Sequence, residues 1–190
     1  MKTDIILAGV GGQGILSIAT IIGHAALNEG LYIKQAEVHG MSQRGGDVQS
    51  NLRISSDPIA SDLIPLGGAD VIIAMEPMEA LRYLPYLSEE GWIITSSTPF
   101  VNIPNYPDQQ AIMEELKSRK NVKLLDLDAM GKEHSMPKAV NMMLLGAAAD
   151  ALALGFDKLQ NSIRTVFGAK GEQIVEMNIK ALTLGRECVK

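Results

Sequence analysis

The stretch "ILAGVGGQGIL", residues 6–16, decides the fold, because a cluster of glycines follows a run of apolar residues. Gly9, Gly11 and Gly14 have the G-x-G-x-x-G spacing that is typical of nucleotide-binding loops when it lies between a strand and a helix. The apolar run before the glycines predicts a buried strand, and the residues after them predict a helix. This Rossmann-like start leaves two interpretations open: a loop that holds an anion, and a turn without a ligand.

The composition of the chain restricts the classes of function. Its 190 residues, 46% of them hydrophobic, are enough for one domain, residues 1–190, with a sizeable core. A net charge of -5 argues against a nucleic-acid partner, which requires clustered Lys and Arg. No apolar run approaches the roughly 20 residues of a membrane-spanning helix, and the N-terminus does not resemble a signal peptide. We therefore expect a cytoplasmic protein with no membrane partner.

Strand patterns recur along the first two thirds of the chain, with helical patterns between several of them. Strands are expected over residues 4–8, 31–38, 47–55, 69–75, 91–97 and 121–128. Unbroken apolar runs indicate parallel strands covered on both faces, whereas residues 47–55 alternate in polarity and are expected to form an edge or partly solvated strand. The second and third strands are separated by too few residues for a helical crossover. The prediction is an α/β protein with three α/β/α layers and a mostly parallel, mixed sheet.

The last third of the chain is expected to be helical. Helices are predicted over residues 13–28, 137–154, 157–167 and 172–184. Small residues such as Gly146 permit close approach of another helix or of a subunit, and the polar Asn141 is expected to cap, to cross-link or to point into a cleft. The proline-rich segment 96–110 resists helix and strand. It is interpreted as a surface loop, either a ligand contact or a simple connector.

The individual glycines of the first segment have separate expected roles. Gly9 permits a tight turn, Gly11 lets backbone N–H groups approach a phosphate, and Gly14 lets helix and strand pack closely. A helix that starts near Gly12 or Gln13 aims unpaired N–H groups and its positive dipole end at an anion. A phosphate or a carboxylate fits this arrangement.

An acidic residue about 20 positions after the glycines is expected in a dinucleotide site, where it binds the ribose hydroxyls. Glu37, at the end of the second predicted strand, occupies this place. An NAD(P)-dependent oxidoreductase is therefore one alternative function. A non-catalytic scaffold without a ligand is another.

A second glycine segment, "HGMSQRGGDV", covers residues 39–48. Arg44 followed by Gly45 and Gly46 combines a fixed cation with a turn whose N–H groups can form an anion-binding hollow. If the first two strands are parallel neighbours, both glycine segments emerge at the carboxyl edge of the sheet and face one cleft. His39 is a candidate general acid or base, or a loop histidine hydrogen-bonded to the backbone.

Metal ligation is not expected in this chain. Cys188 is the one cysteine, so neither an intrachain disulfide nor an iron–sulfur cluster can form from cysteines of this chain alone. His24 and His134 have no second ligand at metal spacing. We expect no metal site.

The motifs "GVGGQG" and "VHGMSQRGGDV", with "ADVIIAMEPMEALRYLPYL" and "KAVNMMLLGAAA" further along, carry a family resemblance over nearly the whole chain. The chain resembles the gamma-type subunit or domain of 2-oxoacid:ferredoxin oxidoreductases, and within these the small subunit of indolepyruvate ferredoxin oxidoreductases. The resemblance implies oxidative decarboxylation of a 2-oxoacid with coenzyme A to acyl-CoA, carbon dioxide and reduced ferredoxin. Ser42 and Gln43 before Arg44 favour the aryl-pyruvate branch.

The resemblance also implies a division of labour. The chain has no G-D-G…N stretch for magnesium and thiamine diphosphate and too few cysteines for a cluster. Thiamine diphosphate, Mg²⁺ and iron–sulfur clusters are therefore expected in a larger partner subunit, with ferredoxin as the electron acceptor of the complex, and the isolated chain is expected to be inactive. The candidate phosphate or coenzyme A contact implied for this chain comprises Gly11, Gly12, Gln13 and Gly14, beside Arg44, Gly45 and Gly46.

Overall fold

The computed structural model describes residues 1–40 and 45–189. Its centre is a six-stranded sheet with the order β2-β3-β1-β4-β5-β6. The strands are β1 (Lys2–Val10), β2 (Tyr32–His39), β3 (Asp47–Ser55), β4 (Ala69–Ala74), β5 (Leu87–Ser96) and β6 (Val122–Leu125). The pairs β1–β4, β4–β5 and β5–β6 are parallel, whereas β3 runs antiparallel to both β1 and β2. The predicted mostly parallel, mixed sheet is therefore confirmed.

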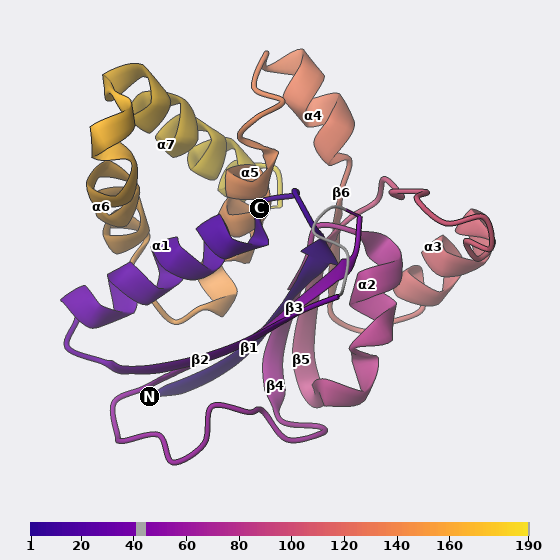
Figure 1. The fold of residues 1–190 in the computed structure, drawn as a ribbon, viewed down its shortest axis with the longest axis horizontal. Helices are drawn as coiled ribbons and strands as arrows, with labels where there is room; N and C mark the ends of the chain where they lie inside the picture. Colours follow the sequence, from indigo (N-terminus) through magenta and orange to yellow (C-terminus); the bar gives the residue numbers. More distant parts are fainter. Residues whose placement is uncertain (41–44, 190) are drawn as a thin grey trace.

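Helices cover both faces of the sheet (Figure 1). The α-helices are α1 (Ile15–Asn28), α2 (Pro77–Arg82), α3 (Gln109–Lys117), α4 (Leu127–Glu133), α5 (Val140–Ala148), α6 (Phe156–Phe167) and α7 (Glu172–Glu187), and short 3₁₀ turns occupy Leu84–Tyr86, Ala149–Ala151 and Gly168–Lys170. Helices α1, α5, α6 and α7 lie on one face, and α2 and α3 lie on the other. The α/β prediction with three layers is confirmed.

The prediction that residues 47–55 form an edge strand is wrong. Strand β3 lies between β2 and β1, and β2 is the edge strand. The polar face of β3 is covered by the loop 56–68: the Ile64 N–H donates to Asn51 Oδ1 at 3.1 Å, and Arg53 donates to two carbonyl oxygens of the same loop. The alternation in polarity therefore reflects hydrogen bonding to a loop instead of exposure to water.

Several predicted boundaries shift for local reasons. The expected strand over 121–128 ends early because Asp126 caps α4 and accepts a hydrogen bond from the Ala129 N–H at 2.9 Å. Strand β5 begins at Leu87 instead of residue 91. The expected helix over 137–154 shortens to α5 and continues only as a 3₁₀ turn.

Helices α5 and α7 touch through their backbones. A Cβ atom added to Gly146 would lie 1.9 Å from the Leu182 carbonyl oxygen, and one added to Gly185 would lie 1.8 Å from the Met143 carbonyl oxygen. The expected close approach at Gly146 is confirmed, and its partner is a helix of the same chain. This contact fixes α5, whose N-terminal end reaches the carboxyl edge of the sheet.

Across residues 1–40 and 45–189, every helix is too short or too polar to cross a bilayer.

Candidate functional site

A large pocket lies at the carboxyl edge of the sheet. The chain leaves β1 through α1 on one face of the sheet and leaves β4 through α2 on the other face. The edge between β1 and β4 is therefore a topological switch point, where open α/β sheets bind their ligands. A pocket of about 540 Å³ opens there.

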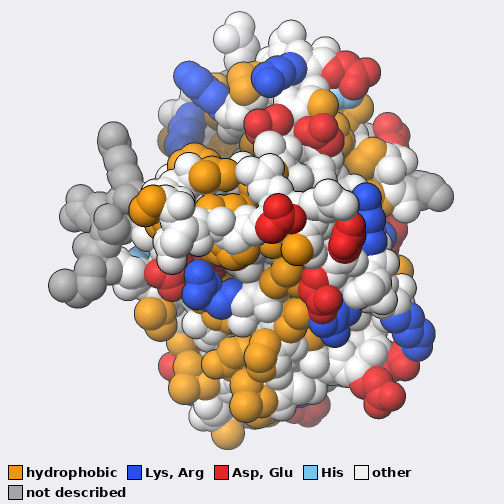
Figure 2. All heavy atoms as spheres, turned by 90° about the vertical axis from the view of Figure 1, so that its right-hand side faces the viewer, with side chains coloured by type: hydrophobic (Ala, Val, Ile, Leu, Met, Phe, Trp, Pro, Cys, Tyr) orange, Lys and Arg blue, Asp and Glu red, His pale blue; other side chains and the backbone are white. Residues whose placement is uncertain are grey.

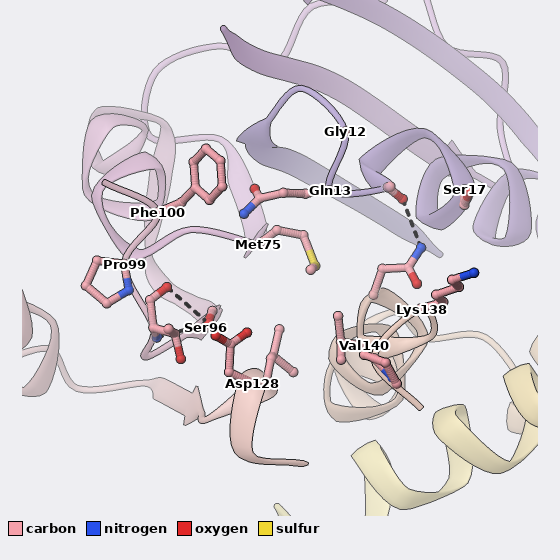
Figure 3. A pocket seen from close by; sticks show the side chains of 15 residues that line it. Gly12, Gln13, Ser17, Met75, Ser96, Pro99, Phe100, Asp128, Lys138 and Val140 are labelled. Carbon is pink, nitrogen blue, oxygen red and sulfur yellow. Dashed lines mark hydrogen bonds between the residues drawn. The ribbon is translucent and has the colours of Figure 1, made fainter. Parts of the chain in front are cut away.

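The pocket is lined by the segments that follow four strands. Figure 3 shows Gln13 and Phe100 at one end, Lys138 and Val140 at the other, and Met75 between them. The lining residues are Gly12, Gln13, Gly14, Ser17, Met75, Ser96, Thr98, Pro99, Phe100, Leu127, Asp128, Pro137, Lys138, Val140 and Asn141. Glycine loop, proline-rich loop and the starts of α4 and α5 thus enclose one space.

The turn after β1 is made by two glycines other than Gly9. Gly9 lies within the strand, where a Cβ would come 2.9 Å from Gln13 Oε1 and 3.0 Å from the Ile15 side chain. The expectation that Gly9 forms the tight turn is wrong, because its role is to admit the start of α1. Gly12 (φ 102°) and Gly14 (φ 85°) have the left-handed backbone that glycine favours.

Asn141 joins the starts of two helices. Its Nδ2 donates to the Gly14 carbonyl oxygen at 3.2 Å, and its Oδ1 accepts the Met142 N–H at 3.1 Å. A Cβ on Gly14 would lie 2.6 Å from this amide nitrogen. The expectation that Gly14 lets a helix and a strand pack closely is wrong about the partner, because the close contact at Gly14 is between the starts of α1 and α5. Asn141 both cross-links these helices and lines the pocket.

The glycine loop, which lines the pocket, has backbone N–H groups without an acceptor among the described residues. Helix α1 begins at Ile15, two residues later than predicted, and Gln13 Oε1 accepts the Val10 N–H at 2.7 Å. Within the described part of the chain, the N–H groups of Gly12, Gly14 and Ile15 have no hydrogen-bond acceptor. Such donors at a helix start favour an anion.

The charges at the pocket have opposite signs. The exposed Lys138 adds a cation at the start of α5, and the exposed Asp128 lies at the start of α4. The cation lies at the end of the pocket away from Phe100 (Figure 3). The pocket is therefore suited to a ligand that is negative on one side only.

The two glycine segments meet at this edge. The Gly11 N–H donates to the Gly46 carbonyl oxygen at 2.8 Å, and the Gly45 N–H approaches the Gly11 carbonyl oxygen at 3.5 Å. They meet although β3 separates β1 from β2, so the assumption that the first two strands are neighbours is wrong. Arg44 lies outside the described residues. Anion binding by Gly11, Gly45 and Gly46 remains a prediction.

Glu37 and His39 lie away from the larger pocket. Both are on the edge strand β2, and their side chains pair with each other. His39 lines a smaller pocket of about 300 Å³ on the other side of the glycine loop, with Val48 and Leu16. Because β3 lies between β1 and β2, Glu37 does not have the strand-neighbour position of a ribose ligand in a dinucleotide fold. Their ligand-binding and catalytic roles remain predictions.

Sequence reasoning missed the residue that holds the proline-rich loop, Glu76. This carboxylate is completely buried and accepts hydrogen bonds from the Phe100 N–H at 3.2 Å and from the Tyr106 hydroxyl. Burial, followed by this hydrogen bond, raises the pKa of Tyr106. The available signal was an acidic residue before Pro77 at the expected end of a strand, which is a helix-cap position. The loop is a wall of the pocket.

The described residues do not suit an iron–sulfur cluster or another metal centre. No group of three His, Cys, Asp or Glu side chains gathers in residues 1–40 and 45–189. Cys188 follows α7 and is exposed as a residue, but its Sγ atom turns toward the helix end and donates to the Gly185 carbonyl oxygen at 3.1 Å. Partial desolvation of this thiol raises its pKa, which favours the thiol over the thiolate.

Comparisons with known proteins identify relatives along nearly the whole chain. The family model described as pyruvate ferredoxin/flavodoxin oxidoreductase matches residues 4–188. Indolepyruvate oxidoreductase subunit IorB of Archaeoglobus fulgidus is 34% identical over 97% of this chain and 94% of its own length.

Two solved structures share the fold. A 2-oxoglutarate:ferredoxin oxidoreductase from Magnetococcus marinus superposes with a TM-score of 0.78 at 21% identity, over 99% of this chain and 31% of that chain. The gamma subunit of a keto/oxoacid ferredoxin oxidoreductase from Geobacter sulfurreducens superposes with a TM-score of 0.72 at 23% identity, over 98% of each chain. The chain belongs to the pyruvate ferredoxin/flavodoxin oxidoreductase family.

Proposed function

We propose that the chain is the small accessory subunit of an indolepyruvate or aryl-pyruvate:ferredoxin oxidoreductase. The complex oxidatively decarboxylates the 2-oxoacid with coenzyme A and yields acyl-CoA, carbon dioxide and reduced ferredoxin. The observation that carries this proposal is the 34% identity to an indolepyruvate oxidoreductase subunit along nearly the full length of both proteins.

The redox chemistry of this proposal belongs to a larger partner subunit. One cysteine cannot ligate a cluster, and the chain has no G-D-G…N stretch for magnesium diphosphate. The partner therefore carries thiamine diphosphate, Mg²⁺ and the clusters, and ferredoxin accepts the electrons. Exposed apolar side chains of the proline-rich loop, among them Phe100 and Val101, support a subunit contact. Figure 2 shows hydrophobic side chains gathered between charged groups on the face that lies to the right in Figure 1.

The pocket at the switch point is the proposed contact for the phosphates of coenzyme A. The N–H groups of Gly12 and Gly14 donate to one phosphate, and Lys138 neutralises part of its charge. Phe100, at the far end of the pocket, offers an apolar surface to the rest of the molecule. The Magnetococcus marinus enzyme, which shares the fold, was solved with coenzyme A and succinyl-CoA bound.

Reconstitution tests the proposed subunit role. The chain alone is expected to show no oxidation of indolepyruvate with coenzyme A and a ferredoxin-like acceptor, and the large subunit co-expressed with it is expected to show full turnover. Oxidation by the isolated chain with a nicotinamide cofactor would instead support the dehydrogenase alternative. Equal turnover of the large subunit with and without the chain would support the alternative that the chain is a non-catalytic scaffold.

Replacement of Lys138 tests the coenzyme A contact. Lys138→Ala in the complex is expected to raise the KM for coenzyme A about fivefold, because an exposed ion pair contributes about 1 kcal/mol. The KM for the 2-oxoacid should stay unchanged. Lys132→Ala is the matched control, since Lys132 is also exposed and does not line the pocket. An unchanged KM for coenzyme A in Lys138→Ala would reject this contact.

A further inference from the structure

Glu76 is a buried carboxylate whose hydrogen bonds join separate elements. Its residue exposure is 0%. Its Oε2 accepts the Glu79 N–H at 2.9 Å and caps α2, while its Oε1 faces the proline-rich loop. Within the described residues no Lys or Arg forms an ion pair with Glu76. Arg82, on the helix that Glu76 caps, pairs with Glu79. Its charge is therefore stabilised by hydrogen-bond donors, two of which belong to the loop.

The proline-rich loop has few other attachments. Three prolines in it have no N–H group, and its first residues are held by the Ser97 N–H, which donates to the Leu125 carbonyl oxygen at 2.8 Å. Beyond that point, the Thr98 hydroxyl donates to Asp126 Oδ1 at 3.3 Å, and Glu76 accepts the Phe100 N–H and the Tyr106 hydroxyl. The two bonds to Glu76 enter one carboxylate oxygen from positions six residues apart, so this oxygen ties two separate points of the loop to the start of α2.

The loop in turn reaches the second glycine segment. Asn102 Nδ2 donates to the Gly45 carbonyl oxygen, and Gly45 and Gly46 are hydrogen-bonded to Gly11. A continuous series of hydrogen bonds thus runs from Glu76 through the loop to the start of the glycine loop.

We propose that Glu76 is a positioning residue for coenzyme A: by holding the Phe100 N–H and the Tyr106 hydroxyl, it fixes the Pro99–Phe100 wall opposite Lys138. Glu76 does not line the pocket and does not touch the ligand. Met75, the residue before it, does line the pocket, so the chain presents one side chain to the ligand and the next one to the loop. This inference rests on the proposed coenzyme A contact.

Glu76→Gln in the complex is the primary test, with two readouts. The variant keeps the size of the side chain and loses one acceptor oxygen, so amide hydrogen exchange of residues 97–107 should become about tenfold faster. The KM for coenzyme A should rise about tenfold, while the KM for the 2-oxoacid and exchange in α7 stay unchanged. A purely structural role of Glu76 would not separate the two KM values.

Two further variants keep the test interpretable. Tyr106→Phe removes only the hydroxyl donor and should move both readouts in the same direction by a smaller factor, even if Glu76→Gln fails to fold. Asp108→Asn is the matched control: it removes one negative charge at the end of the same loop and keeps a good cap for α3, where Asp108 accepts the Ala111 N–H at 2.9 Å. It should change neither readout.

The outcomes separate this inference from the function on which it rests. Unchanged exchange of residues 97–107 in both Glu76→Gln and Tyr106→Phe would overturn the positioning role. Faster exchange with a normal KM for coenzyme A, when Lys138→Ala does raise that KM, would also overturn it, because the ligand would bind without needing the wall. A normal KM in Lys138→Ala would reject the coenzyme A contact itself and this inference with it.

Discussion

The two sides of the pocket are held by different kinds of interaction. On the side of α1 and α5, glycines bring backbones and an amide side chain into direct contact, as at Gly14 with Asn141 and at Gly146 with Leu182. On the side of α2, the buried carboxylate of Glu76 holds a loop through hydrogen bonds. The packing of the first side requires glycines, because a Cβ atom would clash there. The second side requires a buried carboxylate whose oxygens accept hydrogen bonds from the loop.

This difference has consequences for how the two sides respond to substitution. Close backbone contact cannot relax around an added methyl group, so changes there should destabilise the whole domain. A hydrogen-bonded loop can open locally while the sheet stays folded. We therefore expect global losses on the α1 and α5 side and local losses on the α2 side.

The largest effect is expected at the crossing of α5 and α7. Gly146→Ala places a Cβ 1.9 Å from a backbone oxygen, and the resulting shift of α7 should lower the free energy of unfolding by about 3 kcal/mol. Urea denaturation measures this change. Gly168→Ala is the control, because nothing lies within 4 Å of its Cβ position, and it should be neutral or slightly stabilising. Equal free energies of unfolding for the two variants would contradict the claim that close backbone contact holds the α1 and α5 side.

A smaller effect is expected in the glycine loop. Gly14→Ala combines a positive φ of 85° with a contact to Asn141, and should cost about 2 kcal/mol. Gly12→Ala has a positive φ of 102° and open space around its Cβ, so only the backbone strain of about 1 kcal/mol remains. Thermal or chemical unfolding distinguishes them. If Gly12→Ala is the more damaging variant, the contact with Asn141 does not set the loop.

The smallest effect concerns the buried Tyr83, at the end of α2, at high pH. Burial, followed by the charge of Glu79, raises the pKa of Tyr83 to about 12. The pKa of Tyr83 is higher in the folded state than the usual value of about 10. The contribution of the protonated Tyr83 to the free energy of unfolding is therefore complete below pH 10 and is lost as the pH rises towards 12.

When the pH rises from 9 to 11, the free energy of unfolding of the parent should therefore fall by about 1 kcal/mol more than that of Tyr83→Phe. Denaturant unfolding at the two pH values measures this difference. Tyr32→Phe is the control, because Tyr32 is half exposed on the edge strand. Parallel losses in Tyr83→Phe and the parent would argue against a buried, neutral Tyr83.

The sequence predicted those features of the fold that are encoded in short, local patterns. The glycine spacing, the apolar strands and the small residues of α5 identified the Rossmann-like start, the three layers and the close helix contact, because each of these is encoded within a few consecutive residues. The order of β2 and β3 was not recoverable in this way. The polar residues of β3, such as Asn51, form hydrogen bonds with a loop instead of with water. The alternation of polar and apolar residues is the same for a strand covered by a polar loop and for a strand exposed to water.

The candidate site was predicted only in part for the same reason. Gly12, Gln13 and Gly14 line the pocket as a local motif. Lys138 lines the pocket, and Glu76 holds one of its walls, only through contacts between segments far apart in the chain. The position of Glu76 before Pro77 indicates a helix cap, but it does not indicate the loop that Glu76 holds. Glu37 satisfied a spacing rule whose geometric basis, adjacent first and second strands, the sheet does not provide.

Amide hydrogen exchange with and without coenzyme A tests the central claim most directly. If the pocket at the switch point holds the phosphates of coenzyme A, the ligand should slow exchange of residues 11–17 and 98–101 in the complex and leave the edge strand β2 unchanged. Unchanged exchange at residues 11–17 under saturating coenzyme A, or protection confined to β2, would contradict the account.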